Sequence, residues 1–184
     1  AGRPARLLFK MNTFQDHPFA DLIYRAAASG VQVDLIVRGI CIVRPHLPDV
    51  SGKIRVISIV GRFLEHSRAF YFLNGGDEEL YLGSADLMPR NLDRRVEVLF
   101  PIQDLAMRDY LKDQILELYL KDNIKARELY QDGSYHRITP EKGEEHLSLQ
   151  DALLERAHKA TKQGVRFHAL PRSGIPGEAN APNT

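Results

Sequence analysis

The segment from Gly61 to Arg95 gathers the residue types that phosphate chemistry requires. It contains one histidine, His66, together with several arginines and two glycine-containing turns between short apolar runs. Arginine offers a planar, permanently charged fork that matches phosphoryl oxygens, and histidine suits proton or phosphoryl transfer near neutral pH. Glycine lets backbone N–H groups approach an anion closely. The segment therefore predicts a site that binds or transfers phosphate.

The composition is that of one soluble globular domain. The chain has 184 residues and a formal net charge of +1, so its total charge gives no argument for nucleic-acid binding. Arginine nevertheless outnumbers lysine 17 to 8, and many of the arginines lie between Arg38 and Arg95. We therefore expect a local anion site and no specific nucleic-acid partner, although any single arginine could equally be a solvated surface residue.

Several features indicate the cellular compartment. No apolar run approaches the roughly 20 residues that cross a bilayer, and the N-terminus lacks the apolar stretch of a signal peptide. The single cysteine, Cys41, excludes an internal disulfide and is expected to be a small buried residue rather than a nucleophile. We predict a cytoplasmic location, with peripheral attachment to the inner face of the membrane left open. The chain lacks an initiator methionine, so it could be a piece of a longer protein.

The order of apolar patterns predicts an α/β fold with a mixed β-sheet flanked by helices. A strand over 6–11, a helix over 19–28 and a strand over 31–37 would form a βαβ unit with parallel strands. Arg38 directly follows the second strand, and ligands of open α/β sheets bind at the carboxyl ends of strands. Its position alone makes Arg38 a candidate anion ligand.

The remaining chain predicts further strands and helices. The run Asn74-Gly75-Gly76-Asp77 between apolar segments is a strong hairpin signal. The other predicted elements are strands over 54–60, 69–73, 79–82 and 95–102, an amphipathic helix over 104–120, a hairpin over 126–130 and 135–138, and a helix over 148–162. The composition beyond Gly164 is poor in hydrophobic residues. We therefore expect one domain over 1–162 and a disordered tail over 163–184.

Two short motifs resemble a degenerate form of the phospholipase D signature, H-x-K-x4-D followed by G-S-x-N. Here the corresponding runs are His66-Ser67-Arg68 and Gly83-Ser84-Ala85-Asp86. Arg68 replaces the lysine, Asp86 replaces the asparagine, and Leu73 stands where the aspartate would be. In that chemistry the histidine acts on phosphorus, the cation holds a phosphoryl oxygen, and the Gly-Ser turn adds close donors.

A longer set of segments resembles the C-terminal domain of the type 1 polyphosphate kinase family, over roughly Arg6 to Leu154. The matching runs, in order and spacing, are Lys10-Met11-Asn12, VDLIVRGIC (33–41), IRVISIVGRFLEHSR (54–68) and NGGDEELYLGSADLMPRNLDRRVEVLFPI (74–102). These enzymes reversibly transfer the terminal phosphate of ATP to inorganic polyphosphate. The resemblance implies the second of two tandem phospholipase D-like domains.

The resemblance also implies roles for Arg38 and His66. In the family, the arginine of the R-G-x-C segment and the histidine of the L-E-H segment contact the nucleotide, and these positions match Arg38 and His66. The phosphorylated histidine and the magnesium-associated residues belong to the preceding domain, which no segment of this chain matches. His66 is expected to face that phosphohistidine, and to hold the transferring phosphate or to act as general acid. ATP or ADP, polyphosphate, Mg²⁺ with ligands outside this chain, the remaining domains of the enzyme and a homo-oligomer are implied as partners.

A second tier of polar residues is predicted to line the polyphosphate path. These residues are Arg62, Arg68, Ser84, Arg90, Asn91 and Arg94. Alternation in the expected strand over 95–102 would place Arg94 and Arg95 on opposite sides, so at least one should be structural. Ser84 and Asn91 could equally be turn residues, and Arg38 could instead pair with Asp34 or Glu65. The histidines other than His66 show no spacing typical of a metal site, so no metal ligand is predicted in this chain.

Two other function classes stay open. A phospholipase D-like phosphodiesterase or nuclease would need His66 from each protomer of a dimer, and Leu73 in place of the aspartate argues against it. A non-catalytic module that binds polyphosphate or nucleotide is the third class. Calorimetry with ATP and with polyphosphate would separate binding from inertness.

Overall fold

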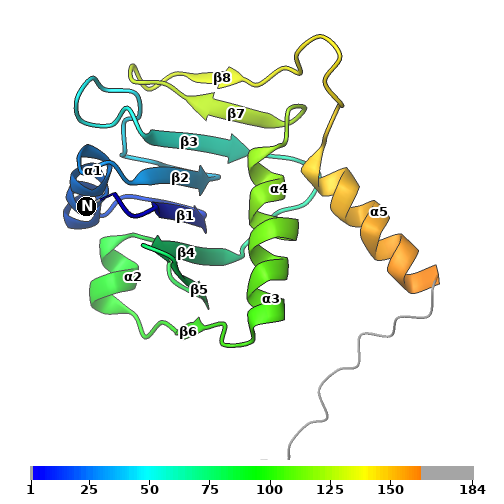
Figure 1. The fold of residues 1–184 in the computed structure, drawn as a ribbon, viewed down its shortest axis with the longest axis horizontal. Coiled ribbons are helices and arrows are strands. Elements are labelled where there is room, and N and C mark those ends of the chain that lie inside the picture. Colours follow the sequence, from blue (N-terminus) through cyan, green and yellow to red (C-terminus); the bar gives the residue numbers. More distant parts are fainter. Residues whose placement is uncertain (1, 163–184) are drawn as a thin grey trace, which may run out of the picture. The chain divides into compact units, whose positions relative to one another are not determined.

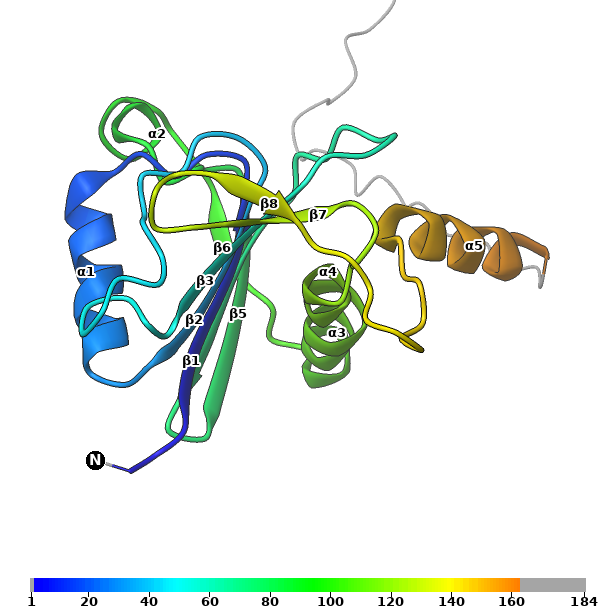
Figure 2. The same ribbon diagram turned by 90° about the horizontal axis from the view of Figure 1, so that it is seen from above.

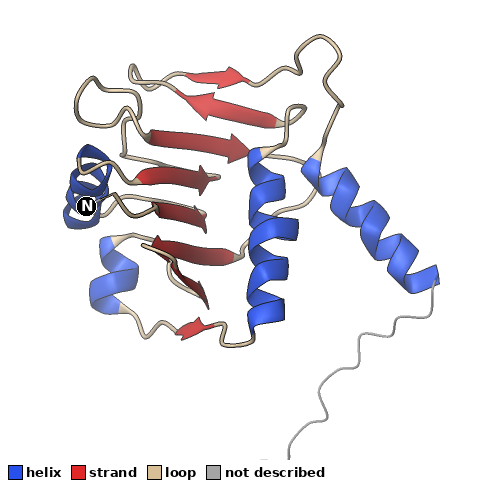
Figure 3. Ribbon diagram, in the orientation of Figure 1, coloured by secondary structure: helices blue, strands red, loops and turns tan. Residues whose placement is uncertain are grey.

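The computed structural model describes residues 2–162 and contains one mixed β-sheet with helices on both faces (Figure 1; Figure 3). The chain divides into two compact units, Ala1–Ala152 and Leu153–Thr184, and the whole sheet belongs to the first. The predicted fold class is confirmed. The predicted tail over 163–184 lies outside the described residues. No helix of the described part is long and apolar enough to cross a membrane.

The sheet has parallel strands at its centre and antiparallel strands at its edges. Its order is β6-β5-β4-β1-β2-β3-β7-β8. The strands are β1 Ala5–Met11, β2 Gln32–Val37, β3 Ile54–Ile59, β4 Arg68–Asn74, β5 Asp77–Gly83, β6 Leu99–Pro101, β7 Ala126–Leu129 and β8 Tyr135–Arg137. β1, β2 and β3 are parallel, and the other pairings are antiparallel. The predicted βαβ unit is confirmed, and most residues of its two strands are buried because both faces of the sheet are covered.

Helices cover both faces of the sheet, as Figure 2 shows. α1 (His17–Ala28) and α2 (Pro89–Arg94) lie on one side, and α3 (Leu105–Asp109), η1 (Tyr110–Leu116) and α4 (Glu117–Leu120) lie on the other. α1 begins at His17 because Asp16 Oδ1 accepts a hydrogen bond of 2.8 Å from the Phe19 N–H. The predicted helix over 104–120 is confirmed as the run α3–η1–α4, of which η1 is π-helical. The last described helix is α5 (Leu149–Lys162).

The predicted hairpin at Asn74 is also confirmed. Asn74 pairs with Asp77 in the register of β4 and β5. Gly75 and Gly76 between them have φ angles of +67° and +115°. Glycine adopts these values without steric cost, which explains why the chain reverses here.

The strand predicted over 95–102 is wrong in its extent. β6 covers only Leu99–Pro101, and the preceding residues 89–94 form α2. Leu99 pairs with Gly83, the last residue of β5, so residues 95–98 have no strand beside them. Arg94 therefore ends a helix, and the alternation argument for Arg94 and Arg95 does not apply.

Asp122 joins three elements at one end of the sheet. Its Oδ1 accepts hydrogen bonds of 3.0, 2.6 and 3.0 Å from the N–H groups of Ile124, Lys125 and Ala126. Its Oδ2 accepts a bond of 2.8 Å from the Leu149 N–H. One buried carboxylate thus fixes the end of α4, the start of β7 and the start of α5.

We expect Asp122→Ala to lower the free energy of unfolding by about 2–4 kcal/mol, because it leaves several buried N–H groups without an acceptor. Urea unfolding followed by circular dichroism would measure the change. Asp132→Ala is the matched control and should cost less than about 1 kcal/mol, since among residues 2–162 the exposed Asp132 bonds only to Ser134. Equal losses in the two variants would contradict the assignment.

Candidate functional site

The carboxyl ends of β1, β2, β3 and β5 meet the start of β4 at one edge of the sheet, around the carboxylate of Asp86. Asp86 is only 5% exposed. Its two oxygens accept from Arg68 Nε and Nη2 at 3.2 and 3.1 Å. Asp86 Oδ1 also accepts from the backbone N–H of Asn12 at 2.7 Å and from the Asn12 Nδ2 at 3.3 Å. Arg68 and Asp86, two of the three departures from the phospholipase D signature, are therefore partners of each other.

These contacts determine the charge of Asp86. Burial alone would raise the pKa of Asp86, but hydrogen bonds from Arg68 and the Asn12 backbone outweigh it and hold the pKa below its usual range. Asp86 is thus an anion at neutral pH and acts only as an acceptor. Asn12 must turn its Nδ2 toward it, so the Asn12 Oδ1 faces the other way.

That Asn12 oxygen accepts hydrogen bonds from Arg38. Directly after β2, the half-buried Arg38 donates from Nη2 and Nε to Asn12 Oδ1 at 2.9 and 3.3 Å. The alternative pairings with Asp34 and Glu65 do not form, because Asp34 pairs with Arg6 and Glu65 pairs with Lys10. Arg38 is oriented by a neutral amide, and its charge is not neutralised by any carboxylate among residues 2–162.

His66 lies in the connection between β3 and β4, and its backbone is held on both sides. The buried Lys10 donates to Ser67 Oγ at 2.8 Å and pairs with Glu65 Oε2 at 3.3 Å. Arg68 Nη1 donates to the His66 carbonyl at 2.8 Å. The residue itself is exposed, and the hydrogen bonds at this position involve its backbone. The loop is therefore fixed while the imidazole faces solvent.

Gln150 clamps the same loop from the start of α5. Its Oε1 accepts from the Phe63 N–H at 2.9 Å, and its Nε2 donates to the Phe63 carbonyl at 2.9 Å and to Glu65 Oε1 at 2.8 Å. A Cβ on Gly61 would lie 2.4 Å from Gln150 Oε1, so only glycine permits this approach. The side chain of Gln150 thus bonds to the loop much as a neighbouring strand would.

The buried Lys10 and the half-buried Glu65 form an ion pair beneath the loop. Glu65 also accepts a hydrogen bond from the Tyr119 hydroxyl, and Lys10 Nζ lies 5.0 Å from the centroid of the Tyr119 ring. Burial lowers the pKa of Lys10, although Glu65 partly offsets this effect. Both groups are bonded to partners within the chain, and these contacts position the loop.

The second tier of predicted residues separates into two groups. Arg62 shares a cavity with Arg38, Asn12 and the loop before His66, in which its guanidinium carbon lies 5.4 Å from the Phe63 ring centroid. The remaining members lie elsewhere or are already engaged. Arg68 binds Asp86, and both Ser84 and Asn91 donate hydrogen bonds to Glu97. Arg90 and Arg94 are exposed on α2 and lie outside the cavities that Arg38 lines.

The environment of Cys41 agrees with the expectation that its thiol is not a nucleophile. It packs half-buried against the core, and burial raises the pKa of its thiol to about 11. The thiol is therefore protonated at neutral pH and is a poor nucleophile.

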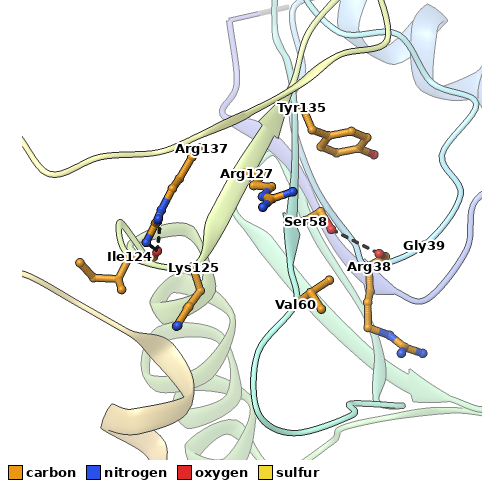
Figure 4. Close-up of a pocket in the computed structure, with 9 residues that line it drawn as sticks. All are labelled: Arg38, Gly39, Ser58, Val60, Ile124, Lys125, Arg127, Tyr135 and Arg137. Atoms are coloured by element: carbon orange, nitrogen blue, oxygen red, sulfur yellow. Dashed lines mark hydrogen bonds between the residues drawn. The ribbon is translucent and has the colours of Figure 1, made fainter.

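Sequence reasoning missed several functional candidates. Lys10, Asn12 and Asp86 occur in the sequence motifs, but the motifs do not indicate their roles. Those roles depend on contacts between residues that are 57 and 74 positions apart in the sequence. A second cavity of about 560 Å³ next to Arg38 adds Lys125, Arg127 and Arg137 (Figure 4). Their basic character was the available signal, but nothing in the sequence joined them to Arg38.

Comparison with known proteins assigns a family to this arrangement. The model of the family described as polyphosphate kinase C-terminal domain 2 matches residues 1–150. A polyphosphate kinase of Thermosynechococcus vestitus is 51% identical over 158 residues, which cover 86% of this chain and 21% of that protein. A polyphosphate kinase of Pseudomonas aeruginosa is 49% identical over 155 residues, covering 84% of this chain and 22% of that protein.

A solved structure gives the same result. The crystal structure of polyphosphate kinase from Porphyromonas gingivalis superposes with a TM-score of 0.82 and 39% identity, over 88% of this chain and 24% of that chain. The chain thus spans about a fifth of the length of the curated relatives it matches. The resemblance drawn from the sequence motifs is confirmed.

We expect Asp86→Asn to destabilise the fold by about 2–4 kcal/mol at neutral pH, because Arg68 stays charged and loses its buried partner. The pKa of Asp86 in the fold lies below its ordinary 3.8. The stabilisation from its ionised form is therefore complete above that pH and is lost as the pH falls through the lower value. Urea unfolding over a pH series should show the deficit of the variant shrinking below about pH 4. The exposed Asp93→Asn is the control, and a deficit independent of pH would contradict the mechanism.

We expect Gln150→Ala to free the loop before His66 without unfolding the domain. Loss of the paired hydrogen bonds to Phe63, worth about 1–3 kcal/mol, should speed amide hydrogen exchange at Phe63 by roughly 5- to 100-fold. Gln103→Ala, at an exposed site, serves as the control. Unchanged exchange at Phe63 would show that Gln150 does not hold the loop.

Proposed function

The chain belongs to the polyphosphate kinase family, and from this premise we propose that it forms the nucleotide- and phosphate-holding part of an ATP:polyphosphate phosphotransferase. The whole enzyme would reversibly transfer the terminal phosphate of ATP to inorganic polyphosphate. ATP or ADP, polyphosphate and the remaining domains of the same enzyme are the partners in this proposal, and a homo-oligomer is its expected assembly.

The state of Arg38 is the observation that supports this proposal most directly. Five arginines of the described chain are half-buried: Arg6, Arg38, Arg55, Arg68 and Arg108. Four of them pair with carboxylates, and Arg38 is the exception. A half-buried guanidinium without a counter-charge is costly unless an anion arrives, and its fork geometry suits phosphate oxygens.

His66 complements Arg38 in the proposed reaction. Phosphoryl transfer passes through a loose, highly charged transition state, so fixed positive charge and alignment matter more than covalent chemistry from this part. Arg38 would hold phosphate oxygens of the nucleotide. His66, on a fixed loop with an exposed ring, would hold the transferring phosphate or donate a proton to it. Arg62 would extend the binding wall, because it shares a cavity with Arg38.

In this proposal Mg²⁺ would arrive with the substrate phosphates and would not be bound by residues of this chain. Among residues 2–162 there is no group of three or more His, Cys, Asp or Glu side chains suited to a metal ion. Asp86, which bonds to Asn12, and Glu65, which precedes His66, already pair with Arg68 and Lys10. The ion would be held by substrate phosphates and by ligands outside this chain.

The competing functions have weaker support. In a phospholipase D-like hydrolase the cation after the histidine would contact substrate, whereas Arg68 is bound to Asp86. A non-catalytic binding module would retain the anion site without turnover. Calorimetry with ATP and polyphosphate, combined with an activity assay of the full-length enzyme, distinguishes these cases.

We expect Arg38→Ala or His66→Ala in the full-length enzyme to lower turnover by about 10²-fold or more without unfolding the protein. Phosphate transfer from ATP to polyphosphate and circular dichroism would be measured on the same samples. The control is Arg25→Ala on the exposed face of α1, which removes the same charge far from the site. Turnover close to that of the wild type in either variant would overturn the assignment.

A further inference from the structure

The cavity beside Arg38 is lined by four cations and by no Asp or Glu. Arg38 forms one wall (Figure 4). Lys125 directly precedes β7, Arg127 lies in β7, and Arg137 lies in β8. Arg38 also lines the first cavity, which includes Asn12 and Arg62. An anion held by Arg38 could therefore continue into the second cavity.

Strand register arranges these side chains in a row. Ser58 of β3 lies opposite Arg127 of β7, and Arg127 lies opposite Arg137 of β8. Residues opposite each other in a sheet share one face, and neighbouring strands are roughly 4.8 Å apart. Ser58 Oγ donates to the Arg38 carbonyl at 3.3 Å, which joins the row to Arg38.

The positive charges of this row do not stabilise the fold. Two like charges directly opposite each other destabilise a sheet. The nearest carboxylate in sequence, Glu128, follows Arg127 on the opposite face and pairs with Arg55 and His46. Arg137 donates to the Ile124 carbonyl at 2.8 and 3.2 Å, which fixes the guanidinium but leaves its charge. The described part of the chain holds no carboxylate partner for the exposed Arg127 or Lys125, so both cations are available to an anionic ligand.

We infer that this row is a subsite for the polyphosphate chain beyond the phosphates held at Arg38, and that it makes the enzyme favour long chains over short ones. The inference rests on the proposed function. A linear polyanion fits because the cations extend across neighbouring strands, whereas one phosphate group contacts only one or two of them. A nucleotide held at Arg38 already places its own phosphates there and does not require charges on β8.

The test compares ligands of one chemistry and different length. Binding of long-chain polyphosphate, tripolyphosphate and ATP to the full-length enzyme would be measured by calorimetry at several salt concentrations. The variants are Arg127→Gln, Arg137→Gln and, as a control with the same charge change, Arg25→Gln. Arg127→Gln is the cleanest variant, since the exposed Arg127 has no hydrogen bond or ion pair in the described chain to lose.

We expect each row variant to weaken binding of long-chain polyphosphate by roughly two- to fivefold. It should also reduce the slope of log K against log salt by about one. Binding of tripolyphosphate and ATP should not change. The unfolding midpoint of Arg127→Gln should stay level or rise, because the repulsion with Arg137 is relieved.

Other results would overturn the inference. Equal losses for ATP and polyphosphate would assign the row to the nucleotide, and unchanged binding of long chains would leave it without this role. If the wild-type enzyme binds neither ATP nor polyphosphate, the proposed function fails together with the inference. Normal binding by the wild type and by all variants defeats the inference alone.

Discussion

The ionised carboxylate of Asp86 is the constraint on which the site depends. Burying a charge is costly, and here the guanidinium of Arg68 and the amides of Asn12 and Thr13 offset that cost. Because those partners come from the end of β1 and the start of β4, the carboxylate holds these strand ends together. It also fixes the Asn12 amide, whose oxygen then orients Arg38. A buried carboxylate thus sets the direction of Arg38, the proposed anion ligand.

The basic residues of this edge divide by whether an internal carboxylate neutralises them. Lys10 and Arg68 are buried or half-buried, paired, and bonded to the backbone or side chains of residues 65–68. They hold the loop that carries His66. Arg38, Arg127 and Lys125 keep their charge uncompensated within the described chain. The distinction follows from energetics, since a paired charge contributes to structure while an unpaired one contributes to ligand binding.

The sequence was sufficient for features that local pattern encodes. The βαβ unit follows from apolar runs around one amphipathic helix, and the position of Arg38 follows from the rule for strand ends. The pairing of Arg68 with Asp86 and the row of Arg127 and Arg137 could not be predicted, because they depend on how distant strands come into register. α2 was missed, and β6 was predicted too long, for a related reason. RVEVLF alternates like a strand, but its neighbour β5 ends at Gly83, and alternation carries no information about where a partner stops.

The pairing of Arg68 with Asp86 explains how this site departs from the phospholipase D pattern it resembles. In that pattern a lysine and an asparagine stand at these positions, and the cation holds substrate. Replacing the asparagine by aspartate supplies a buried negative charge, and a guanidinium binds that charge with two parallel hydrogen bonds where an ammonium could not. The cation is thereby withdrawn from substrate and becomes structural. In the proposed function, positive charge for the phosphates then comes from outside the motif, and we propose that the half-buried, unneutralised guanidinium of Arg38 at the neighbouring strand end supplies it.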